Sequence, residues 1–443
     1  TGISNDLHEN ALKAATAKGS ETTPYNLSNN TGGNTVENTA NCYVVNAPGY
    51  YSLPLVYGNA IKNSATNASA YTSTVTGTNI LNPFINHAGN GITDPYISGN
   101  GCTPAKAELV WQDAMNLVTD IKYNADSNGG NISFKVDRSS IRQGNAVIAI
   151  KDVSDAILWS WHVWVTDEDI NNVIEITNHQ NVKYNFMPVN LGQRDGNTIT
   201  YEERSCKVKF IAGDQSKEIT IKQLANVIAT GSNAPFYQWG RKDPLYPSNG
   251  MGNTTKIWYD KEGIPSTANP MKGTFSAGND CIKNCILNPN LMHNRYNGDY
   301  TYYNLWSADN KTTSANDNPV NKTIYDPCPV GFKLPASNAF TGFTTTGESV
   351  SSSTQVNGTW SSSEKGWYFY TNSEKTQSIF FPALGYRSYS TMRPGSIGTQ
   401  GCFWSAHPVA EGNNYYLRTS SVDVQPTYMV DRGFGYALRP CQD

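Results

Sequence analysis

Charged residues are scarce in this 443-residue chain. They make up 16% of the sequence, compared with roughly 25% in an average soluble protein, and the formal net charge is only -3. Because the sequence has no basic field, we expect neither nucleic acid nor an anionic membrane surface as a partner. No apolar run reaches about 18 residues, so we also expect no transmembrane segment.

Cysteine is present but not dense. The eight cysteines stand at positions 42, 102, 206, 281, 285, 328, 402 and 441. Their spacing completes no zinc pattern, and disulfide bonds in an oxidising compartment are plausible although the pairing cannot be read from the sequence. The sequence opens with no signal peptide and no lipid-accepting cysteine, so we expect that a secreted form would have been trimmed.

Neutral polar residues and tyrosine take the place of charge. The chain has 26 tyrosines, and Asn, Ser, Thr and Gly must cover much of its surface. Two interpretations stay open. Tyrosine-rich neutral surfaces are typical of extracellular binders, where Tyr offers contact area at low entropic cost. Tyr and Thr also fill the strands of any β-rich protein.

The first half of the chain has the pattern of a β-sandwich. Residues 1–36 are weakly patterned and predict a flexible segment with one or two helical turns around Leu7–Ala14. Short strand-like runs then recur across residues 37–175. Residues 157–165 alternate with large apolar groups on both faces, which predicts a central strand covered on each side. Short strands at regular spacing favour an immunoglobulin-like sandwich, with a long loop over residues 66–104.

The second half carries an ordered set of motifs. The motifs are Phe186-Met187-Pro188-Val189-Asn190-Leu191-Gly192, Tyr237-Gln238-Trp239-Gly240-Arg241-Lys242-Asp243-Pro244, Asp326-Pro327-Cys328-Pro329-Val330-Gly331-Phe332-Lys333-Leu334-Pro335, Gly401-Cys402-Phe403-Trp404-Ser405-Ala406 and Arg432-Gly433-Phe434-Gly435-Tyr436-Ala437-Leu438-Arg439-Pro440. This set resembles the C-type-lectin-like module of the Fibrobacter succinogenes major paralogous family, which is common in Bacteroidetes surface and pilus-tip proteins. The resemblance covers residues 176–443. It implies a mainly β fold with an α+β C-terminal module, and we expect a helix over 337–343 with Ser337 as its N-cap.

A hairpin is predicted inside this module, near residues 205–222. Its strands are residues 206–211 and 218–221, and Gly213-Asp214 form the turn.

The resemblance implies recognition and not catalysis. It suggests an adhesin on the outer cell surface or at a pilus tip, with a protein or glycan ligand on host or microbial cells and with pilus subunits as further partners. Modules of this kind are also targets of diversity-generating retroelements, which vary codons near the C-terminus. A carbohydrate-binding protein for polysaccharide capture is the alternative. A formylglycine-generating type of enzyme shares the fold, but Cys402 stands alone where those enzymes place a reactive cysteine pair.

The candidate ligand face lies between residues 386 and 429. Tyr and Arg are enriched at interface cores, and this segment concentrates them on predicted loops. The alternative is that half of these side chains point inward and fill the core. The candidate ligand-binding residues are Tyr386, Arg387, Tyr389, Arg393, Phe403, His407, Tyr415, Tyr416, Arg418 and Tyr428.

We expect no cofactor, no bound metal and no catalytic residues. Gln425-Pro426-Thr427 differs from the calcium-binding triplets of C-type lectins, since Thr replaces an oxygen ligand. Asp167-Glu168-Asp169 offers carboxylates to a divalent ion, but a solvated acidic loop explains the same residues. His162, inside the alternating strand, is expected to be a hydrogen-bonded structural residue.

Overall fold

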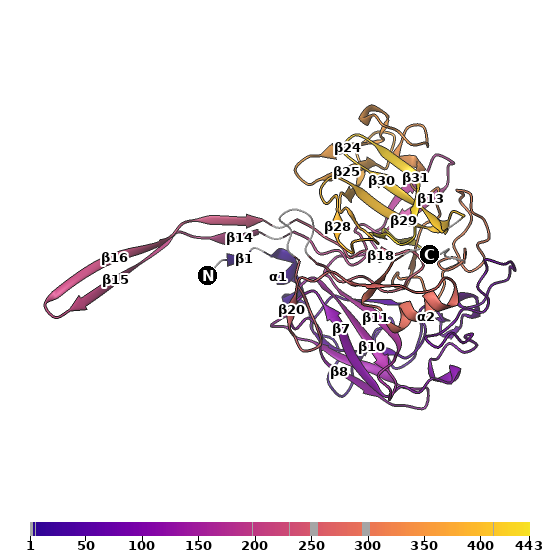
Figure 1. Ribbon diagram of the computed structural model, residues 1–443, viewed down its shortest axis with the longest axis horizontal. Helices are drawn as coiled ribbons and strands as arrows, with labels where there is room; N and C mark the ends of the chain where they lie inside the picture. The colour runs from indigo at the N-terminus through magenta and orange to yellow at the C-terminus, as the bar shows by residue number, and fades with distance from the viewer. Residues whose placement is uncertain are drawn as a thin grey trace.

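The computed structural model describes residues 3–4, 6–196, 198–229, 231–248, 256–294, 302–410 and 412–443. The described chain is mainly β, as the sequence predicts (Figure 1). Its two α-helices are α1 (Leu7–Ala14) and α2 (Asn279–Leu287). Four short 3-10 turns add to them: Ala68–Ala70, Ser98–Asn100, Thr341–Phe343 and Ser353–Gln355. In the described ranges, no helix has the length and apolarity needed to cross a membrane.

Two sheets build the part of the molecule drawn at the bottom of Figure 1. The six-stranded sheet runs in the order β20 (Pro265–Ser266), β19 (Trp258–Tyr259), β7 (Lys106–Gln112), β10 (Gly144–Lys151), β11 (Ile157–Val165) and β3 (Cys42–Val45). The four-stranded sheet runs in the order β2 (Tyr25–Asn26), β4 (Gly49–Pro54), β9 (Asn131–Val136) and β8 (Thr119–Asn124). Apolar side chains of both sheets belong to one core, so the sheets form a sandwich.

Strand β11 confirms the prediction from its alternating sequence, and both of its faces are buried. Trp161 and Val163 lie on one face, in the core shared by the two sheets. The other face contacts the C-terminal half of the chain: the Ser160 hydroxyl donates to Asp243, 2.7 Å away, and the Trp164 indole donates to the carbonyl of residue 193. The strand is therefore apolar on both sides because a different part of the chain covers each side.

The N-terminal segment packs onto the sandwich, although its sequence predicted a flexible stretch. Helix α1 starts at Asp6, whose carboxylate accepts the Glu9 backbone N–H at 2.9 Å. Leu12 of this helix is fully buried, and the side chains of Ser28 and Asn29 are also buried. These contacts place residues 6–36 on the body of the molecule.

Smaller sheets build the C-terminal half. One sheet has the order β12 (Ile174–Thr177), β13 (Lys183–Phe186), β33 (Cys441–Gln442) and β23 (Phe332–Lys333). Another has the order β18 (Tyr237–Gln238), β32 (Gly435–Tyr436), β27 (Tyr386–Arg387) and β28 (Pro394–Gly395). Two three-stranded sheets follow: β24 (Gly358–Ser361), β25 (Gly366–Tyr370), β26 (Ser378–Pro382), and β29 (Gly401–Pro408), β30 (Asn413–Thr419), β31 (Val424–Asp431). The short pairs are β5 (Ile61–Lys62) with β6 (Ala65–Thr66), and β21 (Met271–Gly273) with β22 (Leu291–His293).

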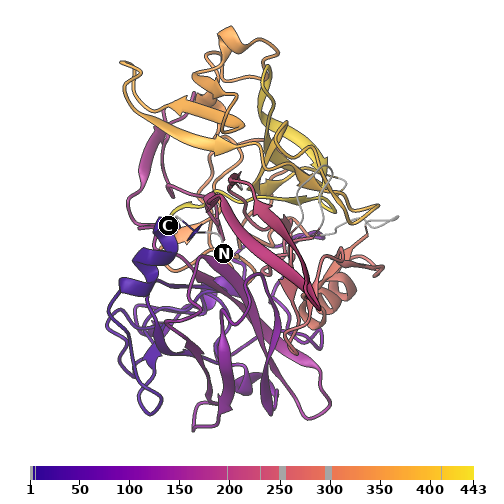
Figure 2. The same cartoon turned by 90° about the vertical axis from the view of Figure 1, so that its left-hand side faces the viewer.

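A long hairpin projects from the body (Figures 1 and 2). It consists of β15 (Arg204–Ala212) and β16 (Gln215–Gln223), joined at residues 213–214 where the sequence predicts the turn. At its base lies a three-stranded sheet of β1 (Ile3–Ser4), β14 (Thr198–Tyr201) and β17 (Asn226–Ala229).

The helix expected over residues 337–343 is absent from these described residues, and this prediction was wrong. A 3-10 turn at Thr341–Phe343 takes its place. The Ser337 hydroxyl accepts the backbone N–H of Asn316 at 2.8 Å and donates to the Asn316 carbonyl at 3.1 Å. Because its hydrogen bonds go to a neighbouring segment, Ser337 caps no helix.

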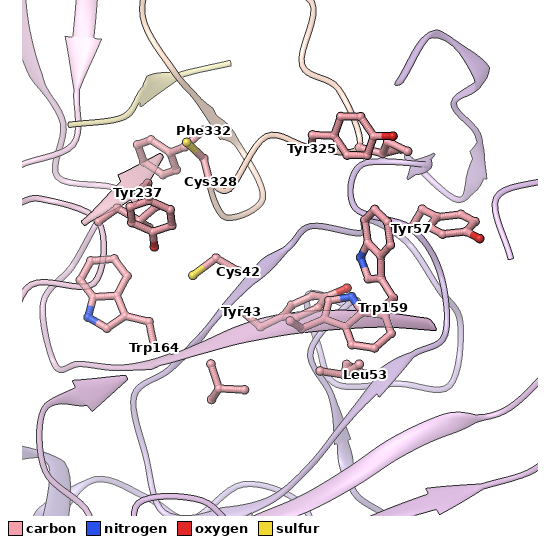
Figure 3. Close-up of a cluster of buried hydrophobic side chains, with 14 of the residues drawn as sticks. Cys42, Tyr43, Leu53, Tyr57, Trp159, Trp164, Tyr237, Tyr325, Cys328 and Phe332 are labelled. Carbon is pink, nitrogen blue, oxygen red and sulfur yellow. The ribbon is translucent and has the colours of Figure 1, made fainter. Parts of the chain in front are cut away.

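One hydrophobic core joins the two halves of the chain. Figure 3 shows Cys42, Tyr43 and Trp159 of the sandwich together with Tyr237, Tyr325 and Cys328 of the C-terminal half. The Trp159 ring lies 4.8 Å from Tyr57 and 6.3 Å from Tyr325, measured between ring centroids. The halves meet through packed aromatic rings, as the elements of a single folded body do.

Polar groups buried at this junction are paired across it. The Asn41 side chain is fully buried; its amide donates to the Ile324 carbonyl at 2.6 Å and to the Asp326 carbonyl at 2.8 Å. Its oxygen accepts the Trp159 indole N–H at 3.0 Å. The Lys242 ammonium donates to the Ser160 carbonyl at 2.8 Å and forms an ion pair with Asp243 at 2.8 Å. Hydrogen bonds that cross this buried junction fix how the two halves sit against each other.

Candidate ligand-binding surface

Four of the candidate ligand-binding residues are buried, which corrects their assignment to a ligand face. Phe403 lies in the core with its ring 5.0 Å from that of Phe381. Arg387 is 1% exposed and donates to the backbone carbonyls of Tyr246, at 3.2 Å, and Met392, at 2.7 Å. Alternation along β27 and β30 turns Arg387 and Tyr416 inward. All eight residues of β29 are buried, so Phe403 and His407 lie in the interior whichever face of the strand they are on.

His407 and Tyr416 are the other two buried candidates. His407 is fully buried, its Nδ1 lies 3.4 Å from the backbone nitrogen of Ser337, and burial lowers its pKa to about 4. Tyr416 is 4% exposed and packs between Trp404 and Tyr436. Both side chains support the fold around the candidate surface and do not contact an external ligand.

The remaining candidates reach the surface. Tyr428 is 45% exposed, Arg393 is exposed, and Tyr386, Tyr389, Tyr415 and Arg418 are half-buried. The Tyr415 hydroxyl donates to the Thr313 carbonyl at 3.2 Å, so this residue points away from the others and toward a neighbouring loop. The ten candidate ligand-binding residues therefore divide into four in the core and six at the surface.

A continuous row of aromatic rings connects three of the six candidates that reach the surface. We call it the aromatic ladder, and it consists of Tyr386, Tyr389, Phe434, Tyr436, Tyr416 and Tyr428. Ring centroids are 4.9 Å apart for Tyr389–Phe434, 5.8 Å for Phe434–Tyr436, 4.6 Å for Tyr436–Tyr416 and 5.8 Å for Tyr416–Tyr428. The ladder thus links residues 386–389 with residue 428 through the interior of the module.

Sheet register places the rings of the ladder. Tyr416 of β30 pairs with Trp404 of β29 on one side and with Tyr428 of β31 on the other, so the three side chains share a face. Phe434 and Tyr436 come from the segment at β32, whose strand pairs with β18 and β27. Tyr416 and Tyr436 are buried and Phe434 is half-buried, while Tyr428 and the neighbouring Met429, 53% exposed, form the outer end.

Arg418 lies beside the outer end of the ladder. Its guanidinium forms an ion pair with Asp423 at 2.7 Å, donates to Gln425 at 3.0 Å, and lies 5.8 Å from the centre of the Tyr428 ring. Two polar partners and one ring hold the cation in place at the surface. A positioned arginine next to an exposed tyrosine is the side-chain pair found at the centre of many protein interfaces.

A cleft of about 330 Å³ lies elsewhere on the C-terminal half, between β13, β23 and β33. Sequence patterns could not predict this cleft, because its walls come from segments far apart in the chain. Four polar groups in its wall form two pairs: the Tyr184 hydroxyl donates to Asp317 at 2.7 Å, and Lys333 forms an ion pair with Asp443 at 3.1 Å. A ligand in this cleft would compete with those pairs.

No disulfide bond joins any of the eight cysteines, all of which lie in the described ranges, so the disulfide bonds considered from the sequence are not formed. Cys402 is buried, and burial raises its pKa to about 12. Cys281 and Cys285 lie one turn apart on α2, and the hydrogen bond between their thiols lowers the pKa of Cys285 to about 7 although both are buried. These two border a cavity of about 30 Å³, the size of one water molecule.

The acidic residues after β11 meet the N-terminal helix. His8 Nδ1 lies 2.9 Å from Asp167 and 3.9 Å from Glu168, and its Nε2 lies 3.6 Å from Asp195. Burial alone would lower the pKa of His8, but the hydrogen bond and charge of Asp167, with the charges of Asp195 and Glu168, raise it. Ligand atoms of His8, Glu168 and Asp195 lie within 4.8 Å of one another, so they have the spacing of metal ligands. The third acidic residue of the predicted group, Asp169, instead accepts the backbone N–H of Asn171.

His162 is a hydrogen-bonded structural residue. Asn145 donates from its amide to Asp113 and Gly192, so its oxygen accepts from His162 Nε2 at 2.8 Å. The Tyr237 hydroxyl then donates to His162 Nδ1 at 3.2 Å. Burial lowers the pKa of His162 to about 3, which keeps the imidazole neutral.

Comparisons of the chain with models of protein families, with curated proteins and with solved structures gave no match. The family resemblance therefore rests on the sequence motifs.

Proposed function

We propose that this chain is a non-catalytic adhesin of the outer cell surface or a pilus tip. It binds a protein or glycan ligand at the outer end of the aromatic ladder. The observation that carries the proposal is the group of Tyr428, Met429 and Arg418, which is held at the surface by buried rings and by paired polar groups. A rigid aromatic and arginine surface binds without a large loss of side-chain entropy.

The strand order of the first half supports an immunoglobulin-like sandwich. If β4, β7, β8, β9, β10 and β11 are lettered B to G in chain order, the sheets read B-E-D and C-F-G. Strand β3 adds to the edge of the second sheet, in parallel to β11. This order is that of the constant-type immunoglobulin fold. A sandwich of this kind serves an adhesin as the stalk or as the attachment to a fibre.

The pairing of β13 with β33 supports a C-terminal module that forms one unit. Phe186, from the first family-like motif, lies opposite Cys441 near the chain end. The start and the end of residues 176–443 thus meet in one sheet, as they do in many compact modules. A C-type-lectin-like module is the fold we propose for this half.

The ring geometry favours a protein ligand over a polysaccharide. The rings that reach the surface stand nearly perpendicular to their neighbours: 71° for Tyr416–Tyr428, 82° for Tyr386–Phe434 and 89° for Tyr389–Phe434. Coplanar rings would offer the C–H face of a sugar ring a broad aromatic surface to stack on, whereas edge-to-face rings offer an irregular surface that suits a protein ligand. Glycan capture is the second candidate, because Tyr428 still presents an exposed ring.

The test is a screen of the full chain on glycan and protein arrays. The full chain is required because the two halves share one core. Tyr428→Ala and Arg418→Ala should each weaken binding of the ligand found by about 10-fold to 30-fold, as interface anchors do. The matched control is Tyr50→Ala, since Tyr50 is half-buried with Lys135 5.6 Å from its ring centre, far from the ladder.

Two results would count against this proposal. One is ligand binding that survives both Tyr428→Ala and Arg418→Ala, which would place the site elsewhere. The other is binding lost on addition of a chelator, which would replace the aromatic mechanism with a metal-dependent one. Enzymatic turnover would have to be sought separately, beginning with thiol reactivity.

A further inference from the structure

The projecting hairpin exposes nearly every side chain that it carries. We call β15 and β16, residues 204–223, the arm. Along both strands every described side chain is exposed, apart from Val208, which is half-buried. Figure 1 shows the arm extending away from both halves of the molecule, and in Figure 2 the arm points toward the viewer.

The arm has one apolar face and one polar face. Residues that lie directly opposite each other in the two paired strands share a face. The register pairs Cys206 with Ile221 and Val208 with Ile219. Phe210 lies on this same face, opposite Lys217. The other face carries Ser205, Lys207, Lys209, Ile211, Ser216, Glu218, Thr220 and Lys222. On this polar face Lys207 and Glu218 form an ion pair at 2.9 Å.

An apolar face of this kind is unfavourable in water. The exposed fractions are 57% for Phe210, 44% for Ile219 and 55% for Ile221. A two-stranded ribbon is at best marginally stable alone, and exposed apolar strands tend to pair with another surface. The apolar face of the arm therefore has the properties of an interface.

Charge indicates that a second copy of this chain covers the face. The arm holds five basic residues and two acidic ones, a net charge of +3, so the rest of the chain carries -6 to give the total of -3. The apolar face itself carries Arg204 at its base and Lys217 opposite Phe210, and it carries no carboxylate. Its complement is an apolar surface rimmed with acids, and the body of the same chain has the required sign of charge.

The area of the arm indicates that a stable dimer needs both arms, each contacting the other copy. One face of the arm covers about 300 Å². Each strand has nine residues at about 3.4 Å each, and the two strands lie about 4.8 Å apart. A single contact of two arms would bury about 600 Å² in total, which is below the roughly 1,200 Å² of a specific interface. Two arms, each lying on the body of the other copy, would reach about 1,200 Å².

We propose that two copies of this chain form a dimer by exchanging arms. Each arm lies with Val208, Phe210, Ile219 and Ile221 on the acidic body of the other copy, in a twofold arrangement. This proposal is independent of the ligand-binding function at the aromatic ladder, which lies on the C-terminal sheets.

The test is sedimentation of the full chain over a range of protein and salt concentrations. Wild type should dimerise, and Ile219→Thr with Ile221→Thr should raise the dimer dissociation constant at least about tenfold. Threonine keeps β-propensity, so the hairpin remains a hairpin. The matched control is Ile211→Thr, which makes the same change at a 69% exposed position on the opposite face and should leave the constant unchanged.

Two further measurements separate assembly from misfolding. Arg204→Glu with Lys217→Glu should also raise the dissociation constant and should reduce its dependence on salt. The Cys206 thiol, on the apolar face, should become protected from alkylation as the wild-type concentration rises. Tryptophan fluorescence reports the body, whose buried tryptophans lie outside the arm.

A wild type that stays monomeric at the highest concentration reached overturns the proposal, and the arm would then serve a different partner. An equal effect of Ile211→Thr and of the apolar-face pair overturns it as well, since the face would not matter. Dimers that persist while Cys206 stays reactive would place the interface away from the arm.

Discussion

Replacing Asn41 with alanine tests whether the two halves unfold as one body. Asn41→Ala leaves three buried groups without their partner: the carbonyls of Ile324 and Asp326 and the indole N–H of Trp159. Each loss costs about 1–3 kcal/mol, and solvent or shifted neighbours recover part of it, so we expect a total of about 4 kcal/mol. With about 2.1 cal/mol/K of unfolding entropy per residue, a unit of 443 residues has about 0.9 kcal/mol/K. The thermal unfolding midpoint of Asn41→Ala should then lie about 4 °C below that of wild type, and calorimetry should show a single transition.

Separate domains would respond differently to the same change. If the sandwich of residues 37–175 unfolded alone, its entropy of about 0.3 kcal/mol/K would convert 4 kcal/mol into a shift of about 14 °C, while a second transition stayed in place. Two transitions, of which one moves by more than about 10 °C, would refute the shared core. The matched control is Asn100→Ala: Asn100 also makes three short hydrogen bonds to backbone, but within one loop that is half open to solvent. Its midpoint should fall by about 1–2 °C, because water replaces the lost bonds.

The other predictions concern pH, a buried arginine and the thiols. The raised pKa of His8 stabilises the folded state fully below the unfolded value of 6.5, and this stabilisation is lost as pH rises through the folded pKa. Urea unfolding at about pH 5.5 and 8 should show this loss of stability in wild type and not in His8→Gln. An equal change of unfolding free energy with pH in both proteins would disprove it. Arg439, 1% exposed, donates to Asn190 at 2.8 Å and to the Phe380 carbonyl at 2.7 Å, so Arg439→Lys should cost about 2–4 kcal/mol in chemical denaturation, whereas Arg393→Lys at an exposed position should cost nothing measurable. Alkylation of dilute protein should label exposed Cys206 first, and a fast phase that persists in Cys206→Ser would show that access does not govern reactivity here. Buried Cys285 should react slowly despite its pKa of about 7, and fast labelling of it would reopen the enzymatic alternative.

Local patterns predicted the strands well. Residues 157–165 alternate over nine positions, and the structure has β11 at Ile157–Val165. The arm follows from two apolar-polar alternations around Gly213, which lies at φ 59°, a value that glycine adopts without strain. The period of two is a property of each segment itself, so the sequence contains it.

The predictions of helices from the sequence were less successful. Ser337 has the sequence of an N-cap, but Asn316 takes its hydroxyl and no helix follows among residues 337–343. Helix α2 was missed because its nine residues, Asn279–Leu287, start at Gly278 with no capping side chain. For Ser337 a tertiary contact outweighed the local preference, and for α2 the local signal itself was weak.

The candidate surface shows the same limit. Tyrosine and arginine between residues 386 and 429 look alike in sequence, yet Arg387 and Tyr416 are buried while Arg418 and Tyr428 reach the surface. Alternation alone cannot say which face of β30 meets the core, because that depends on what packs against it.

The sequence by itself determined the β-rich composition of the chain, the β11 strand, the arm and its two faces, since each depends on neighbours within a few residues. Only the tertiary structure decided that the two halves share one core, that Asn41 joins them, and that six aromatic side chains form a ladder. The shared core and the Asn41 contacts join residues hundreds of positions apart, and the ladder joins separate strands. The energy of these features comes from burial and hydrogen bonds that exist only once the chain has folded.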